Sequence, residues 1–500
     1  MKVLCLGNNT QDTDIKTRDL AKIEQSACYG LLSELDGPIE PVVQKGWYHS
    51  SVYDIEYGRL VALATEFDLI IMLNQPKEQY SHPDAFYKTV TLIKNLPNGK
   101  FLDPGYATSI DFFENLVDTN KSFCIFPFIE LLTNHRVDGF TTVCCRSTTP
   151  VAHISEITDW QTNKNYQEIR NKMLNGVKIP DYCSSCYELE SKNILSARQQ
   201  ETVEWANRLN LKSLRDLDKI THPSYYEIRP SNICNLQCRM CDPTGSHLIG
   251  REYKKINLVP ELPPKERSDF SIVNFTNLKK LYVAGGEPTA MTEFYNFLDL
   301  CIQQNKTDFE FVINTNATKL SNRFKKQLKE FSNIQFIVSL EGIGSLNHYI
   351  RWPSKWDTIV ENMKYLRKNG HFITTNTTLS IYNVLGLYDL LKFFDDNFPG
   401  MLVHCFFCKS KDDILSGLRF PDSVLALEKL SPIKELNCYK NDRLLKSFID
   451  GIITHYQSIP EIDLDRLKLF FEFNDKLDRS RDIKLDDYIP ELEQARKLIK

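Results

Sequence analysis

Six strand-like runs alternate with helix-like stretches between residues 222 and 420, and this alternation limits the possible fold more than any other feature. The runs are rich in β-branched and aromatic residues and span residues 225–229, 281–284, 309–314, 334–340, 372–379 and 401–407. Amphipathic patterns typical of helices separate them, for example at residues 294–304, 322–331 and 356–368. We therefore expect an α/β fold with a partial (β/α)6 TIM-like barrel over residues 222–420. Catalytic residues in such a barrel lie at the carboxyl ends of the strands.

Three further segments are expected around this barrel. Residues 1–118 contain apolar runs at 3–6 and 67–73 separated by helix-length stretches, which predicts an open α/β domain of unknown role. Residues 119–205 concentrate cysteines and are expected to form a small module. Residues 421–500 are charged and helix-patterned, so we expect a helical C-terminal cap. Its charges between Asp475 and Asp487, including Arg479 and Arg481, are typical of a solvated helical face.

Charge and composition limit the partners and the cellular compartment that we expect for this protein. The net charge of −4 over 500 residues shows no basic excess that would indicate a nucleic-acid partner. The N-terminal apolar run is too short for a signal peptide, and no run of about 18 apolar residues could span a membrane. We expect a cytoplasmic protein, in which the fourteen cysteines stay reduced and clustered cysteines bind metal or take part in catalysis.

Three of these cysteines, Cys234, Cys238 and Cys241, fall within eight residues directly after the first predicted barrel strand, with no fourth cysteine nearby. A 4Fe-4S cluster held by three thiolates leaves one iron open for a substrate or cofactor. The alternative is a zinc site completed by a distant residue such as His247.

The Cys-x3-Cys-x2-Cys spacing, followed after the second strand by Gly285-Gly286-Glu287-Pro288, resembles the radical S-adenosylmethionine (SAM) enzymes. The resemblance implies that the methionine part of SAM chelates the open iron of the cluster. An electron from a low-potential donor such as flavodoxin or ferredoxin then cleaves SAM to a 5′-deoxyadenosyl radical that abstracts hydrogen. Many members carry an aromatic residue before the third cysteine, whereas this chain has Met240, which could still pack on the adenine.

Further positions at strand ends extend the resemblance. The two glycines are expected to lack side chains because the backbone there approaches a ligand closely, and Glu287 is expected to offer a carboxylate or carbonyl to the methionine ammonium group. Similarity to the family's polar strand ends implies that further residues contact ribose or the methionine carboxylate: Asn314, Asn316, Ser339, Glu341 and Arg351. Ser339 and Arg351 are the strongest of these candidates, because an arginine fork matches a carboxylate. The simpler interpretation is that each is a helix cap or a surface pair.

A second cysteine set precedes the barrel: Cys124, Cys144, Cys145, Cys183 and Cys186. An apolar segment with Asp138-Gly139 at its predicted turn, followed by a cysteine and then a Cys-x2-Cys pair, resembles the SPASM/twitch type of auxiliary iron–sulfur module. The resemblance implies a second 4Fe-4S cluster held by Cys124, Cys144, Cys183 and Cys186, with Cys144 favoured over Cys145. The alternative is a structural zinc site on the same cysteines. Cys405 and Cys408 are expected to be ordinary buried thiols.

These features predict an enzyme that abstracts hydrogen from a substrate for modification. Members with such auxiliary modules often modify peptides, so the resemblance implies a peptide or protein substrate. The alternatives are a small molecule or sugar substrate, or a non-catalytic iron–sulfur or zinc scaffold.

Overall fold

The computed structural model describes residues 2–7, 40–44, 69–73, 100–102, 112–113, 116–133, 139–157, 159–191, 196–262 and 270–499. The chain divides into two compact units. Unit 1 comprises residues 1–130, 143–149 and 159–223, and unit 2 comprises residues 131–142, 150–158 and 224–500. Each unit is described by itself.

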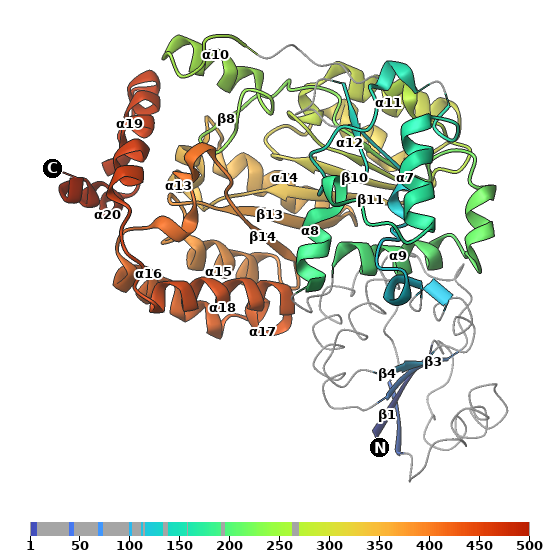
Figure 1. Ribbon diagram of the computed structural model, residues 1–500. Helices are drawn as coiled ribbons and strands as arrows, with labels where there is room; N and C mark the ends of the chain where they lie inside the picture. Colours follow the sequence, from blue (N-terminus) through green and yellow to red (C-terminus); the bar gives the residue numbers. More distant parts are fainter. Residues whose placement is uncertain are drawn as a thin grey trace. The chain divides into compact units, whose positions relative to one another are not determined.

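Unit 2 is built on an eight-stranded sheet in the order β14-β13-β11-β10-β9-β7-β5-β6. Six of these strands are parallel to their neighbours: β7 (Tyr225–Ile228), β9 (Lys280–Val283), β10 (Glu310–Thr315), β11 (Ile334–Ser339), β13 (Phe372–Leu379) and β14 (Val403–Phe407). An antiparallel pair, β5 (Glu130–Thr133) and β6 (Thr141–Thr142), completes the sheet beyond β7. The predicted α/β fold is therefore confirmed as a mostly parallel sheet (Figure 1), and every predicted strand lies within two residues of the observed one.

Helices follow the strands as the alternation predicts. The connections carry α10 (His247–Lys255), α11 (Thr292–Gln303), α12 (Asn322–Gln327), α13 (Gly344–Ile350), α14 (Trp356–Lys368) and α15 (Leu387–Asn397). Residues on β11 alternate between buried and half-buried, so that one face of the strand packs against helices. Phe294 of α11 packs on Phe311 of the sheet and Phe324 of α12 packs on Phe336, with ring centroids 6.1 and 6.2 Å apart. This aromatic layer fixes the helices on the sheet.

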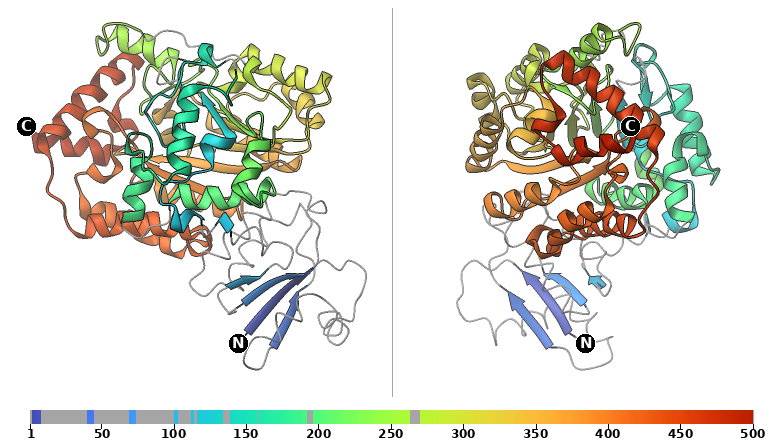
Figure 2. Two further views of the ribbon diagram at one scale, coloured as in Figure 1. Left: turned by 45° about the vertical axis from the view of Figure 1, so that its right-hand side comes forward. Right: turned by 90° about the vertical axis from the view of Figure 1, so that its left-hand side faces the viewer.

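The C-terminal part of unit 2 is helical, as expected from its sequence. It contains α16 (Ser423–Leu430), α17 (Asn437–Asn441), α18 (Arg443–Gln457), α19 (Leu464–Arg481) and α20 (Pro490–Gln494). Asp463 caps α19 by accepting a hydrogen bond from the Arg466 N–H, and Asp482 ends the helix in a left-handed conformation. Figure 2 shows the red α19 beside the yellow-green α10.

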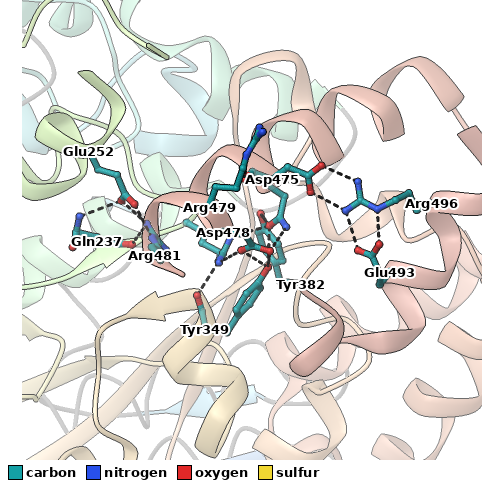
Figure 3. Close-up of polar contacts among 12 residues, drawn as sticks. Gln237, Glu252, Tyr349, Tyr382, Asp475, Asp478, Arg479, Arg481, Glu493 and Arg496 are labelled. Carbon is teal, nitrogen blue, oxygen red and sulfur yellow. Dashed lines mark hydrogen bonds and ion pairs between the residues drawn. The ribbon is translucent and has the colours of Figure 1, made fainter. Parts of the chain in front are cut away.

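The prediction of a solvated face on α19 is wrong at two positions. Arg481 is buried and forms a bidentate ion pair with Glu252 of α10, and Asp478 is buried in an ion pair with Arg239 (Figure 3). The partners lie more than 200 residues away in sequence, so the local charge pattern could not indicate them. Asp475 instead pairs with Arg496, and both side chains are partly exposed.

Unit 1 contains a four-stranded parallel sheet in the order β2-β1-β3-β4. Its strands are β1 (Lys2–Gly7), β2 (Glu40–Gln44), β3 (Leu69–Leu73) and β4 (Lys100–Leu102). The two strands predicted for residues 1–118 correspond to β1 and β3; the helix-length stretches between them lie outside the described residues. The cysteine-bearing part adds α6 (Phe126–Ile129), α7 (Lys164–Leu174), α8 (Pro180–Ser191) and α9 (Ala197–Arg208).

Of the helices in the described residues, none is both long and apolar enough to cross a lipid bilayer.

Candidate active site

The three-cysteine loop follows β7 and lies at the carboxyl end of the parallel strands. Within it, β8 (Gln237–Cys238) pairs antiparallel with β12 (Arg351–Trp352), and the register sets Cys238 opposite Arg351. Backbone pairing across more than 100 residues therefore joins the loop to the segment after β11.

Gly286 allows the loop to lie directly on the end of β9. Its φ is +53°, and a Cβ atom at this position would lie 2.2 Å from the carbonyl oxygen of Ile233 and 2.9 Å from that of Ser231. Gly285 also has a positive φ of +83°. The close approach to a ligand expected from the sequence stays a prediction; the group that lies against Gly286 in the structure is the backbone of the cysteine loop.

Glu287 has all its described hydrogen-bonding capacity engaged within the protein. Its buried carboxylate accepts hydrogen bonds from the N–H and hydroxyl of Thr289, the hydroxyl of Thr315 and the N–H of Asn316. The Glu287 N–H donates to the Ile233 carbonyl at 2.8 Å. The carboxylate therefore joins the ends of β9 and β10. The backbone carbonyl accepts the Ala290 N–H at 2.9 Å, and its second lone pair is the acceptor left for a ligand. Pro288, also buried, begins the short turn that follows.

Asparagine side chains connect the loop to β10. Asn316 donates to Asn235 Oδ1 at 2.8 Å, and Asn235 donates to Thr318 Oγ1 at 2.7 Å. On the neighbouring strand end, Ser339 donates to Asn314 Oδ1 at 3.1 Å. Asn235 and Thr318 were not among the candidates, because a single asparagine or threonine in a loop has no distinctive sequence signal.

Arg351 and Glu341 form a buried ion pair, with Nη1 donating to Oε1 at 2.9 Å. The other carboxylate oxygen accepts the Thr378 N–H at 2.6 Å. Burial raises the pKa of Glu341 to about 7, although Arg351 acts to lower it. The Nε atom of Arg351 is buried and has no hydrogen-bond partner. This pair can therefore still donate one hydrogen bond to a bound group.

The three loop thiols lie close enough for their charges to interact. Burial raises the pKa of each thiol, to about 12 for Cys234. The charge of Cys238 further raises the pKa of Cys234 and Cys241, whereas Arg351 acts to lower the pKa of all three. A bound metal centre would supply the positive charge that buried thiolates need. A Cβ on Gly245 would lie 2.9 Å from the Cys241 sulfur, so glycine keeps this sulfur accessible.

The donor set of the loop fits a cluster held by three thiolates. His247, the alternative zinc ligand, accepts a hydrogen bond from the Cys234 N–H at its Nδ1 atom. Within the described residues, no three cysteine, histidine, aspartate or glutamate side chains are grouped to hold a metal ion. That finding concerns a single ion; a four-iron cluster is larger and spaces its thiolate ligands more widely. Met240 is half-buried directly before the third cysteine.

The second cysteine set lies within unit 1. Cys124, Cys144, Cys183 and Cys186 line one cavity, and Cys145 is exposed. Cys183 and Cys186 lie one turn apart on α8, and burial together with the charge of Cys186 raises the pKa of Cys183 to about 12. Burial and the charge of Cys183 raise the pKa of Cys124 as well.

A buried arginine supports the walls of this cavity. Arg198, on α9, donates to Glu190 from Nε at 2.8 Å and to the Phe123 carbonyl from Nη1 at 2.8 Å. Its charge acts to lower the pKa of Cys124 and Cys183. The four thiols, with this cation behind them, could hold a metal centre.

Residues 228–390 match the family model of the Radical SAM superfamily. The matched segment reaches from the end of β7 to α15, and so this part of the chain is similar to a radical SAM domain.

No curated protein matches the chain. Among solved structures, Streptococcus suis SuiB bound to S-adenosylmethionine is similar at 19% identity over 46% of this chain and 52% of its own, with a TM-score of 0.26. Native anSMEcpe with bound AdoMet is similar at 14% identity over 46% of this chain and 63% of its own, with a TM-score of 0.32. The similarity thus spans less than two thirds of the length of either protein.

Proposed function

We propose that the chain is a radical SAM enzyme that abstracts hydrogen from a peptide or protein substrate for modification. One observation carries the proposal: three mutually interacting thiols, of which Cys238 is buried, lie at the carboxyl end of a parallel sheet, inside the segment that matches the Radical SAM superfamily. Cys234, Cys238 and Cys241 would hold a 4Fe-4S cluster. Bound together, the cluster and SAM would supply the electron and the radical for hydrogen abstraction.

The residues around the loop would orient SAM. Arg351 can donate from its unpartnered Nε while its Nη1 stays bonded to Glu341. The backbone carbonyl of Glu287 would accept from an ammonium group. Asn314, Asn316 and Ser339 are held by neighbours at adjacent strand ends, where hydroxyl groups of a ribose could contact them. Met240 would contact the adenine.

The cysteines of unit 1 support a second, auxiliary 4Fe-4S cluster of the twitch/SPASM type. Cys124, Cys144, Cys183 and Cys186 line one cavity, and the exposed Cys145 does not. With four thiolates the second cluster would pass electrons; with an open iron it would bind substrate. A low-potential donor such as flavodoxin or ferredoxin, in a cytoplasmic setting, completes the proposal.

Anaerobic reconstitution tests the proposed function. The expected result is about eight irons per chain and dithionite-dependent release of 5′-deoxyadenosine from SAM. Retention of zinc without SAM cleavage would instead support a non-catalytic scaffold. To separate a peptide from a small-molecule substrate, 5′-deoxyadenosine release is compared with candidate peptides and with metabolites or sugars, and stimulation by the latter alone would contradict the peptide proposal.

A further inference from the structure

Arg239 lies inside the three-cysteine loop, between Cys238 and Met240, and its side chain is fully buried. The guanidinium donates from Nε to the Tyr349 carbonyl at 2.9 Å and from Nη1 to Asn474 at 2.8 Å, and it forms an ion pair with Asp478. A residue flanked by predicted cluster ligands is therefore anchored on α19.

A second anchor lies one turn further along α19. Arg481 binds both carboxylate oxygens of Glu252, at 2.9 and 2.7 Å, and also donates to the backbone carbonyl of Gln237 at 2.8 Å. Gln237 immediately precedes Cys238, and its side chain donates to Glu252 at 3.1 Å. Figure 3 shows Arg481 of α19 beside Glu252 and Gln237, and Asp478 beside Tyr349. The residues on both sides of Cys238 are thus bonded to one helix, Gln237 through its backbone carbonyl and Arg239 through its side chain.

Two tyrosines make the first anchor rigid. The Arg239 guanidinium lies 3.6 Å from the centroid of the Tyr349 ring, whose hydroxyl bonds to Asp478 at 3.0 Å. The Tyr382 hydroxyl donates to Asn474 at 3.0 Å. Loss of one member would leave a buried charge without its partner, which is costly in a dry environment.

We infer that α19 is a positioning element of the cluster site. Asp478 and Arg481 bond to Arg239 and Gln237 and thereby fix the direction of the Cys238 thiol between these two residues. The role of α19 in cluster binding rests on the proposed function, whereas the contacts that hold the loop to α19 do not.

Thiol alkylation of the metal-free full-length protein tests directly whether these contacts of α19 hold the loop in place. The rate at Cys238 is divided by the rate at Cys301, a fully buried thiol on α11 that reports global unfolding. Asp478→Asn weakens a charge-assisted contact, so this ratio is expected to rise about tenfold. Asp475→Asn, on the same helix but paired with Arg496, is the matched control and is expected to leave the ratio unchanged.

Equal ratios in the two variants, or a parallel rise at both thiols, would overturn the inference. If Asp478→Asn does not fold, Arg481→Lys decides by the same ratio, because lysine keeps the charge but loses the bidentate contact with Glu252. After anaerobic reconstitution, Asp478→Asn is expected to change the electron paramagnetic resonance spectrum of the reduced cluster, and Asp475→Asn to leave it unchanged. A wild-type protein that takes up no cluster would contradict the proposed function while leaving the alkylation result intact.

Discussion

Arg351 donates a hydrogen bond to Glu341 at 2.9 Å, and the same arginine lies opposite Cys238 in the β8–β12 pair. The buried carboxylate therefore balances a cation whose charge acts on all three loop thiols. This connection gives the site a pH dependence that can be measured without any cofactor.

The free energy of unfolding is expected to contain a term from Glu341 that falls as pH rises. Burial raises the folded-state pKa of this carboxyl to about 7, whereas an unfolded glutamate titrates near about 4.3. Between these values the folded state binds a proton that the unfolded state has released, so stability declines across this window. Urea denaturation of the metal-free protein at several pH values measures the slope. Glu341→Gln should make it less negative; an unchanged slope, as expected for the exposed Glu361→Gln, would contradict the assignment.

Gly286→Ala is expected to destabilise the protein more than Gly344→Ala does. Both glycines have nearly the same φ, +53° and +52°, but a Cβ at Gly344 meets nothing within 4 Å. The backbone cost alone is about 1–2 kcal/mol, and the clash with Ile233 should add about 1–3 kcal/mol. Denaturant midpoints compare the two variants. Equal losses would show that the close approach of loop and β9 is unimportant.

Glu287→Gln is expected to lower stability by about 2 kcal/mol. The new amide would turn an NH2 group toward a hydrogen-bond donor, either the Asn316 N–H or the groups of Thr289 and Thr315. The exposed Glu293→Gln on the following helix serves as control and should change little. If thermal unfolding does not distinguish the two, the carboxylate is not the link between β9 and β10 that its contacts indicate.

Cys238→Ala is expected to abolish cleavage of SAM and to reduce iron by about four atoms per chain, because three thiolates are needed for the cluster. Iron analysis and chromatography of 5′-deoxyadenosine measure both effects. Cys301→Ala, which removes a buried thiol distant in sequence from either set, should retain both. Full activity of Cys238→Ala would exclude the loop as the site of the cluster.

Cys186→Ala is expected to leave some uncoupled SAM cleavage while product formation stops, since the second site would serve the substrate half of the reaction. About four irons should be lost, whereas Cys145→Ser, which changes an exposed thiol, should lose none. Product formation is followed by mass spectrometry with a candidate substrate that stimulates 5′-deoxyadenosine release. Complete loss of cleavage in a folded Cys186→Ala protein would count against separate roles.

The alternation of apolar strand runs and amphipathic helix patterns made the parallel sheet of unit 2 predictable from the sequence. The parallel strands carry apolar, β-branched runs between amphipathic helices, and helix α14 begins and ends where its pattern does. The glycines also indicated a close approach at Gly286, which the sequence led us to expect with a ligand; the structure has the cysteine-loop backbone there. The partner of that approach was not predictable, because a glycine signals space without indicating which backbone occupies it.

Long-range pairing explains what the sequence could not indicate. Asp478 and Arg481 have the composition of an exposed helix face, and only the fold brings them to Arg239 and Glu252. The sequence predicted that Glu287 contacts a ligand, yet its carboxylate accepts hydrogen bonds from hydroxyl and amide groups at two strand ends. Burial of a charged group depends on partners that no local pattern specifies.

The separation of 239 residues between Arg239 and Asp478 also orders events during protein synthesis. A ribosome completes the cysteine loop and all six parallel strands before it makes α19. A nascent chain therefore displays the three thiols before their supporting helix exists. The loop can reach its final form only once translation has passed residue 481, so iron delivered earlier would meet a loop that is not yet held.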